Sequence, residues 1–469
     1  RGTMANTALT SIGVKALAAS YAGLQTTGQN IANASVAGYS RQSVVLAPSL
    51  PQFSGSGYFG RGVDVVSVER AHDAFLTREA TGAGSVAAMD AARLAQLTQL
   101  ETQFPTGEQG LGHASTQFFN ALSDLTTQPA DASTRQVVLA RAGDLVSQFQ
   151  RMGAGFDTLQ AGVTAGLKVA VDEVNAMAQN VASLNQRIIA AGALGHPPND
   201  LLDQRDQLIQ RLAQHLQLTR ADADDGSVSL FIAGGQNLVL GATANKLSIQ
   251  ACPGDPSRSA LAIADGPTPR LLSPDTLGGG DIAGLLQFQD DDLMTARRLL
   301  NDFAEKVCSA VNQQQAMGLT PGGTAGQVMF VIAAQPVPLN ASHITLAAGF
   351  GPGDIAAASQ PPAPASSNGN AIALLALRDS AIVDGRTPSD AYAEAMTTIG
   401  VRVQSARTSS GISAAAAAQA EQARAAVAGV NLDEEAARLI QYQQSYQAAA
   451  KMLQVAQSLF DTLLQAAGR

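Results

Sequence analysis

The side chains best able to do chemistry are scattered along this chain of 469 residues. None of its five histidines has the spacing to another histidine or cysteine that a metal site requires. The two cysteines, Cys252 and Cys308, are too far apart in sequence for a CxxC pair and provide no disulfide framework. We interpret both as small residues of the core.

Two acidic runs could in principle hold a cation. The run DADDG at 222–226 resembles the start of a calcium loop, but it has glycine at the fifth position and lacks the glutamate required at the twelfth. We interpret it as a turn before a strand. The second run, Asp290-Asp291-Asp292, is interpreted as the solvated face of a helix.

Motifs for nucleophiles and phosphates are missing as well. The sequence contains no GxSxG elbow and no P-loop. The glycine-rich run at 349–353 is interrupted by Pro352, which makes it a poor phosphate loop at the start of a helix. The sequence therefore predicts no catalytic, cofactor-binding or metal-binding residue, and we expect a protein that is not an enzyme.

The composition favours helices. Charged residues make up 14% of the chain, against about 25% in typical proteins. Hydrophobic residues make up 46%, but aromatic residues only 4%, so much of the apolar content is alanine, a strong helix former. The net charge of −9 argues against nucleic acid as a partner. No apolar run approaches the roughly 18 residues of a membrane span, and the apolar residues of the first segment are spaced rather than continuous, unlike the basic-then-apolar pattern of a secretory signal.

The C-terminal segment has the pattern of a coiled-coil helix over 432–466. Asn431 is a suitable N-cap with Glu434 closing a capping box, and the acidic residues that follow Leu432 suit the positive end of a helix. Steps of four and three connect the following seam residues: Leu432, Ala436, Leu439, Gln443, Tyr446, Ala450, Leu453, Gln457, Phe460 and Leu464.

The N-terminal segment has the same pattern over 5–33. Val14, Leu17, Tyr21 and Leu24 alternate in steps of three and four, and the helix should end before Gly38. Polar residues on the C-terminal seam fix the register or the partner of a coiled coil. The spacing does not decide whether the two terminal helices pack within one chain or between chains.

The interior of the chain predicts a helical bundle with β inserts. Helices are expected at 70–104, 132–191, 281–317 and 388–428, and the second of them contains two heptad runs joined by a stutter. Alternating apolar residues predict a hairpin over 228–240 and two further strands over 247–264.

These patterns predict a mainly α fold with β inserts and four regions. The terminal helices should form an inner coiled coil, from residues 5–68 with 430–469. Long helices should form a bundle, from 69–217 with 281–318 and 378–429. Two small outer regions should contain strands, 218–280 and the Gly/Pro/Ala-rich segment 319–377.

The two ends carry a family resemblance. The segment NIANASVAGYSRQ at 30–42 resembles the N-terminal signature of the bacterial flagellar axial proteins of the rod, hook and hook-associated group. The segments GVNLDEEA at 429–436 and YQQSYQAAAK at 442–451 resemble the other end of the same proteins. The pairing of the two ends is most similar to that of the hook-associated members.

The resemblance implies where assembly takes place. In the N-terminal motif it points to Asn30, Ile31, Asn33, Gly38, Tyr39 and Arg41 as assembly residues. On the C-terminal helix it points to an assembly or chaperone seam of Leu432, Leu439, Tyr446, Leu453, Phe460 and Leu464. Gly38 should adopt positive φ, Tyr39 should pack on the helical layer, and Arg41 should find a carboxylate among residues 433–435.

The resemblance also implies a function. We expect a structural protein that assembles in a short helical layer and joins the hook to the filament, with the β inserts facing outward. Its partners would be further copies of itself, the hook protein, a second hook-associated protein and a cytosolic export chaperone. Export would use the flagellar type III channel without a cleaved signal, and the mature location would be extracellular.

Two alternatives remain open from the sequence. A hook or distal-rod protein would share the ends but usually lacks the long helices predicted at 132–191 and 388–428. A secreted wall-cleaving enzyme with axial-type ends would need carboxylates placed in a cleft, and the middle of the chain shows no such arrangement.

Overall fold

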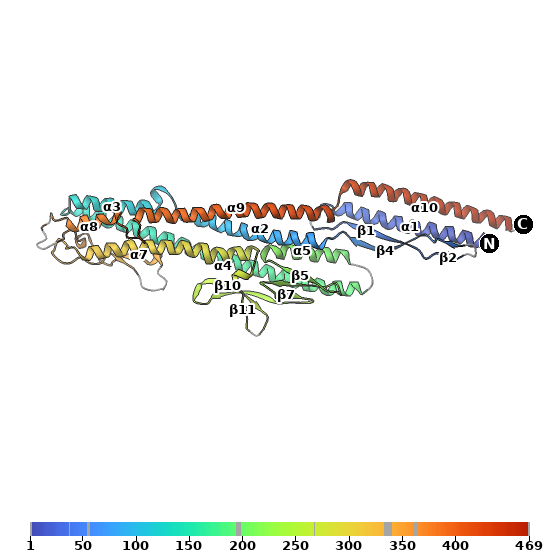
Figure 1. Ribbon diagram of the computed structural model, residues 1–469, viewed down its shortest axis with the longest axis horizontal. Coiled ribbons are helices and arrows are strands. Elements are labelled where there is room, and N and C mark those ends of the chain that lie inside the picture. Colours follow the sequence, from blue (N-terminus) through green and yellow to red (C-terminus); the bar gives the residue numbers. More distant parts are fainter. Residues whose placement is uncertain are drawn as a thin grey trace.

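The computed structural model describes residues 2–36, 38–53, 57–193, 198–266, 268–332, 340–359, 364 and 366–467. The molecule is a long rod with both termini at one end (Figure 1). Two parts follow one another along the rod. The terminal module consists of the first and last helices with the strands that follow the first helix, and the helical body consists of the long interior helices with the β strands inserted among them.

The terminal module is built on an antiparallel pair of helices, α1 (Gly2–Asn33) and α10 (Leu432–Ala467). Both helices agree with the predicted spans. The pair packs closely through glycine, because a Cβ on Gly13 would come within 2.8 Å of Leu453 and one on Gly23 within 2.5 Å of Tyr442. The two terminal helices therefore pack together within one chain.

A β ribbon runs back along α1. It is formed by β1 (Gln42–Pro48) and β4 (Val63–Arg70), which pair antiparallel, and is extended by β2 (Gln52–Phe53) and β3 (Tyr58–Phe59). Lys15 fixes the ribbon to α1 through Asp64, at 2.7 Å.

The helical body contains all the predicted interior helices. Their observed bounds are α2 (Ala74–Glu101), α4 (Ala132–Gly192), α6 (Asp281–Gln287), α7 (Met294–Ala316) and α9 (Pro388–Ala428). Thr387 caps α9 as the sequence indicates, since its side chain accepts a hydrogen bond from the Asp390 N–H. Helices α3 (Leu111–Thr127), α5 (Asn199–His215) and α8 (Gly369–Ala376) were not predicted.

Helix α4 forms the spine of the body. Its 61 residues correspond to a length of about 90 Å. Both heptad runs face the core, and the stutter residues Leu159, Val163 and Leu167 are all buried. The predicted seam of α4 is thus the buried face of an intramolecular bundle.

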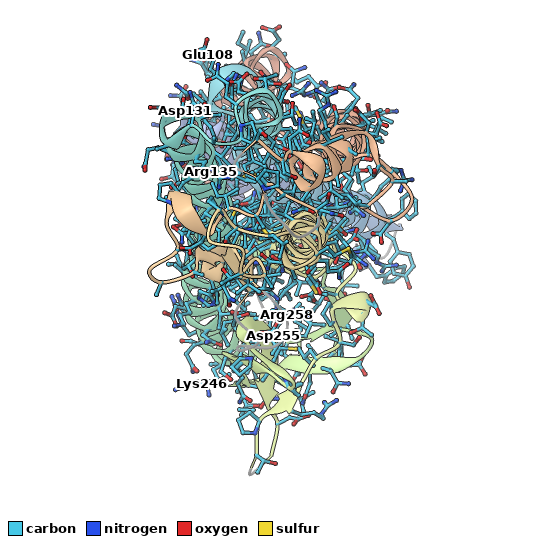
Figure 2. The ribbon with its side chains drawn as sticks, turned by 90° about the vertical axis from the view of Figure 1, so that its left-hand side faces the viewer. Glu108, Asp131, Arg135, Lys246, Asp255 and Arg258 are labelled. Atoms are coloured by element: carbon cyan, nitrogen blue, oxygen red, sulfur yellow. The ribbon has the colours of Figure 1, made fainter. Side chains whose placement is uncertain are left out.

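The strands from β5 to β11 form a β insert on one side of the body, between α5 and α6. One sheet contains β5 (Thr219–Asp222), β6 (Val228–Ile232), β7 (Gln236–Leu240) and β8 (Thr243–Ala244); the other contains β9 (Lys246–Cys252), β10 (Asp255–Ala264) and β11 (Arg270–Leu271). The predicted hairpin and the two further strands are confirmed. In the end-on view, Lys246, Asp255 and Arg258 mark this insert on the opposite side of the rod from Glu108 (Figure 2).

Asparagine side chains attach the β insert to α4. The Asn175 side chain donates to Leu247 O at 2.9 Å and accepts from Leu247 N at 2.8 Å. The Asn185 side chain does the same with Val228, at 2.8 and 3.2 Å. Each amide completes the hydrogen bonding of one strand residue, so the insert lies against the spine.

The end of the rod far from the termini is closed by short elements. These are β12 (Phe330–Val331), β13 (Thr345–Leu346), α8 and several single turns of 3₁₀ helix. The buried Arg135 of α4 connects them to the body, because its guanidinium donates to Pro129 O at 2.7 Å and to Ile355 O at 2.6 Å (Figure 2).

The interpretation of 290–292 as a solvated face is wrong for Asp292, whereas the side chain of Asp291 is 52% exposed. The stretch Phe288–Leu293 is a π-helical segment between α6 and α7, and the Asp292 side chain is fully buried. Arg93 of α2 donates to it at 2.8 and 3.0 Å, and Arg402 of α9 at 2.7 Å. The extra residue of the π turn rotates this carboxylate between two helices, where two guanidinium groups compensate its charge.

The two cysteines differ. Cys308 of α7 is buried in the core as expected, but Cys252 is only partly buried, because it ends strand β9 at the tip of a hairpin. The run at 222–226 is a turn before β6, as predicted: Asp225 accepts hydrogen bonds from the Ser227 N–H and hydroxyl.

Candidate functional site

Asn30, in the last turns of α1, is the centre of a polar cluster that connects both ends of the chain. Its side chain is 1% exposed. The amide nitrogen donates to Gln42 O at 2.8 Å and to Glu435 Oε2 at 2.9 Å. The amide oxygen accepts from Gln42 N and from the Tyr39 hydroxyl, both at 2.9 Å. All four hydrogen-bonding positions of the amide are therefore used.

Glu435 supplies the C-terminal half of this cluster. It lies in the first turn of α10, where a carboxylate is favoured by the helix dipole, and it is fully buried. Its other oxygen accepts from Arg438 at 3.4 Å. The helix begins where the sequence indicates, because Asn431 Oδ1 accepts from the N–H of Asp433 at 3.0 Å. A buried carboxylate is costly without such partners.

Gly38 forms the turn between α1 and β1. Its φ of +75° lies in the left-handed region, as predicted. A Cβ at this position would also overlap the Gln207 side chain of α5. Both the backbone conformation and the close approach require glycine.

Tyr39 is half-buried beside the cluster. Burial raises the pKa of its hydroxyl to about 12, and the carboxylates of Asp203, Asp200 and Glu435 act in the same direction. The hydroxyl is therefore neutral at physiological pH and donates its proton to Asn30.

Arg41 connects the turn to the other end of the chain. Its N–H donates to Ala428 O, the last residue of α9, at 2.8 Å. Its guanidinium lies 3.4 Å from Glu434, so the predicted pairing with a carboxylate at 433–435 is observed. One half of the capping box expected from the sequence is observed, because Asn431 Oδ1 accepts from the Glu434 N–H at 3.4 Å, while the Glu434 carboxylate contacts Arg41.

Two other residues of the N-terminal motif lie outside the cluster. Ile31 is half-buried on α1. The Asn33 side chain donates to Gln29 O of its own helix at 3.0 Å. The structure thus brings together Asn30, Tyr39 and Arg41 with the acidic start of α10, and holds Gly38 against α5.

The predicted seam of α10 is divided between two faces. Leu439 and Leu453 are partly buried, and Leu453 lies against α1. Leu432, Tyr446 and Phe460 are 53, 40 and 46% exposed. The fully buried positions are instead Glu435, Ala449 and Ala456, one residue before predicted seam positions. The side chain of Leu464 lies outside the described residues.

Three residues around the cluster are absent from the site predicted from the sequence. Asp203 accepts the Ser40 N–H at 3.1 Å, Gln207 contacts the Gly38 turn, and Gln42 is buried against Asn30. Two of them belong to α5, which was not predicted, and Gln42 is the first residue of strand β1. Their roles depend on tertiary contacts that no local pattern reports.

The cluster is suited to holding two chain ends together and has no reactive group. Over the described residues, no group of three or more histidine, cysteine, aspartate or glutamate side chains is placed to hold a metal ion. A search of the same residues finds no helix with the length and apolar character of a membrane span.

Two family models match the chain. The model described as the helical domain of flagellar hook-associated protein FlgK matches residues 97–330. The model described as the C-terminal part of flagellar basal body rod FlgEFG proteins matches residues 421–466.

Whole-chain relatives are similar over nearly their full length. Flagellar hook-associated protein 1 of Escherichia coli is 28% identical, covering 96% of this chain and 97% of the relative. The Salmonella typhimurium protein of that name is 29% identical, covering 96% of this chain and 98% of the relative. The Bacillus subtilis protein of that name is 28% identical, covering 97% of each chain. The solved flagellar hook junction protein FlgK of Burkholderia pseudomallei shares the fold, with a TM-score of 0.69 at 19% identity; the match covers 75% of this chain and 100% of the solved one.

Proposed function

We propose that this chain, which belongs to the flagellar hook-associated protein family, is a structural subunit of the bacterial flagellum that joins the hook to the filament. The observation that carries the proposal is the buried contact between Asn30 and Glu435, which brings the two family motifs at opposite ends of the chain into one cluster. A subunit of this kind needs its ends fixed together, because the ends form the inner part of the layer.

The surface of the terminal module supports assembly with further copies. Lys15 is the one charged residue of α1, and it already pairs with Asp64. Large apolar side chains remain exposed on each component of the module: Val14 and Tyr21 on α1, Val66 on the ribbon, and Ile440 and Val455 on α10. Exposed apolar side chains of this kind are typical of contacts that neighbouring subunits bury.

The finer assignments follow from the same proposal. Copies form a short helical layer, the hook protein lies on one side of it, and a second hook-associated protein lies on the filament side. The chain leaves the cell through the flagellar type III channel and acts outside the cell without catalysis or cofactor. The inner coiled coil comprises 5–68 with 430–469, the bundle 69–217 with 281–318 and 378–429, and the outer regions 218–280 and 319–377.

Electron microscopy of hook tips tests the junction role. Cells without the gene should carry bare hooks and release filament protein into the medium, and the intact gene should restore filaments. Filaments retained on the mutant hooks would contradict the proposal. A zymogram on purified cell wall tests the alternative of a wall-cleaving enzyme, and we expect no cleared zone.

We also propose that a cytosolic export chaperone binds α10 before export. Leu453 packs against Gly13 of α1, so a chaperone that covers Leu453 must keep α1 away from α10. Replacing Leu453 and Phe460 with aspartate should abolish binding of the chaperone in calorimetry, while the exposed Val401 of α9 provides a matched control as Val401→Asp. Unchanged affinity of the double variant would show that the chaperone binds elsewhere.

A further inference from the structure

The polar face of α5 receives the terminal module where it joins the body. Asn199, Asp203, Asp206 and Gln207 are spaced by four, three and one residues, so they share one side of the helix. Asn199 and Asp203 are buried, with 9 and 5% of the residue exposed. The side chain of Asp206 is 12% exposed. A helix of the body thus turns a buried polar face toward another part of the molecule.

Each residue of this face contacts the turn or the ribbon of the terminal module. The Asn199 side chain donates to Val68 O of β4 at 2.7 Å. Asp203 accepts from the Ser40 N–H at 3.1 Å and from Arg70 at 2.8 Å. Gln207 lies against Gly38.

Arg70 supplies the positive charge that the two carboxylates Asp203 and Asp206 share in this contact. It ends strand β4, its side chain is 9% exposed, and it lies 2.8 Å from Asp203 and 2.7 Å from Asp206. Burial opposes the charged form of Asp206, but Arg70 and Arg220 outweigh it, so the pKa of Asp206 lies below its usual value. Arg220 of β5 contacts Asp206 at 2.8 Å and so continues the ion pairs into the β insert.

We propose that this face of α5 sets the angle at which the terminal module meets the helical body, with Asp203 as the positioning residue. The inference rests on the proposed junction function, because a subunit between two different lattices must present its inner and outer parts at a defined angle. Asp203 is suited to this task because its two oxygens bind one donor from each side of the ribbon at the end nearest the body, Ser40 before β1 and Arg70 at the end of β4.

The polar character of the contact supports a defined angle. Apolar surfaces can slide with little loss, whereas hydrogen bonds and ion pairs depend on distance and direction. Removing one member leaves a buried charge without its partner, so alternative angles are disfavoured. A backbone hydrogen bond also joins the two parts, since the Arg41 N–H donates to Ala428 O.

Spin-label distances across the joint test the proposal. One label is placed on the β insert as Leu240→Cys and the other on α10 as Val455→Cys, both at exposed positions, in a chain carrying Cys252→Ser. The parent chain should give one narrow distance distribution. Asp203→Asn and Arg70→Gln should each broaden it at least twofold, with unchanged helix content by circular dichroism.

A matched control separates the joint from ion pairs in general. Asp290→Asn removes the contact between Asp290 and Arg258 inside the body and should leave the distribution narrow. Distributions of Asp203→Asn and Arg70→Gln as narrow as the parent's would overturn the inference. That result would leave the junction role intact, because the junction role fails only if cells without the gene retain their filaments.

Discussion

Asn30 and Glu435 lie 2.9 Å apart, although 405 residues separate them in the chain. The neutral amide of Asn30 donates the hydrogen bond that the buried carboxylate of Glu435 requires. Since Asn30 also binds Gln42 and Tyr39, the first contact of α1 with α10 and the start of the β ribbon depend on the same side chain. The contact between the two chain ends and the turn after α1 therefore share one side chain.

The first prediction follows from this shared side chain. Asn30→Leu leaves Glu435 buried without its amide donor, at a cost of about 3 kcal/mol. Amide hydrogen exchange should accelerate by about two orders of magnitude around residues 26–33 and 435–442, up to the rate of unprotected amides. Asn33→Ala is the matched control, because Asn33 binds only a carbonyl of its own helix, and exchange there should change little.

The second prediction concerns the Gly38 turn. Gly38→Val places a β-branched side chain at a φ of +75° and against Gln207, so the turn cannot form as observed. The variant should fold and be exported but should fail to form a stable junction, and cells should shed filament subunits into the medium. Tyr39→Ala should be milder. Cells with Gly38→Val that swim and keep their filaments would show that the turn is not needed for assembly.

A companion variant separates the two causes. Gly38→Ala with Gln207→Ala removes the overlap but keeps the unfavourable φ, whereas Gly38→Ala alone has both. A better junction in the double variant would assign the defect to the close approach.

The third prediction concerns order in the isolated monomer. The buried apolar side chains between α1 and α10 are small, such as Ala19, Ala449 and Ala456, whereas α4 buries large ones along its whole length. Little apolar area then opposes the loss of chain entropy. Hydrogen exchange of dilute monomer should be faster over 5–33 and 432–466 than over 132–191, where protection should be strongest. Equal protection of the three segments would contradict this expectation.

The sequence predicts most of the long helices, because apolar residues that recur at helical spacing over many turns indicate both the helix and its buried face. The spans of α1, α4, α9 and α10 follow from periodicity and caps, and the seam of α4 is the buried face. The seam of α10 is partly misassigned, because Ala449 and Ala456 are buried while Tyr446 and Phe460 are not. Glycines at positions 13 and 23 of α1 bring the helices so close that small residues fill the contact, which a search for large apolar residues overlooks.

The polar contacts could be predicted only where one partner lies in a motif. Arg41 with the acidic start of α10 was predictable from local chemistry. Asp292 was not, because a run of three aspartates looks solvated until the π turn and two arginines from distant helices are in place. Asp203 was missed for the same reason: the two residues that bind it come from the other part of the molecule.

A histidine lies between the two helices that flank the β insert, at a place we call the neck of the insert. His215 ends α5 just before the insert, and Asp281 begins α6 just after it. Their side chains are 2.9 Å apart, and the other ring nitrogen of His215 lies 3.3 Å from Glu173 of α4. The imidazole thus lies between two carboxylates from two neighbouring helices.

The last prediction is the pH dependence of this neck. The hydrogen bond to Asp281 raises the pKa of His215 above 6.5, against the effect of burial, and Glu173 acts in the same direction as Asp281. Because the folded-state pKa is the higher one, the contribution to stability is complete below pH 6.5 and is lost as the pH rises through the folded-state pKa. The free energy of unfolding should fall there by up to about 1.4 kcal/mol per pH unit.

Nuclear magnetic resonance titration of the His215 ring, beside denaturant unfolding at several pH values, measures both quantities. Asp281→Asn removes the larger cause, so it should lower the pKa of His215 and flatten the dependence of stability on pH. Glu173→Gln removes a smaller contribution through a partly exposed carboxylate and should lower the pKa less. The pKa of His215 should therefore fall more in Asp281→Asn than in Glu173→Gln, because His215 lies 2.9 Å from Asp281 and 3.3 Å from Glu173. A His215 pKa at or below 6.5 in the parent chain would mean that the neck is held by packing and backbone hydrogen bonds alone.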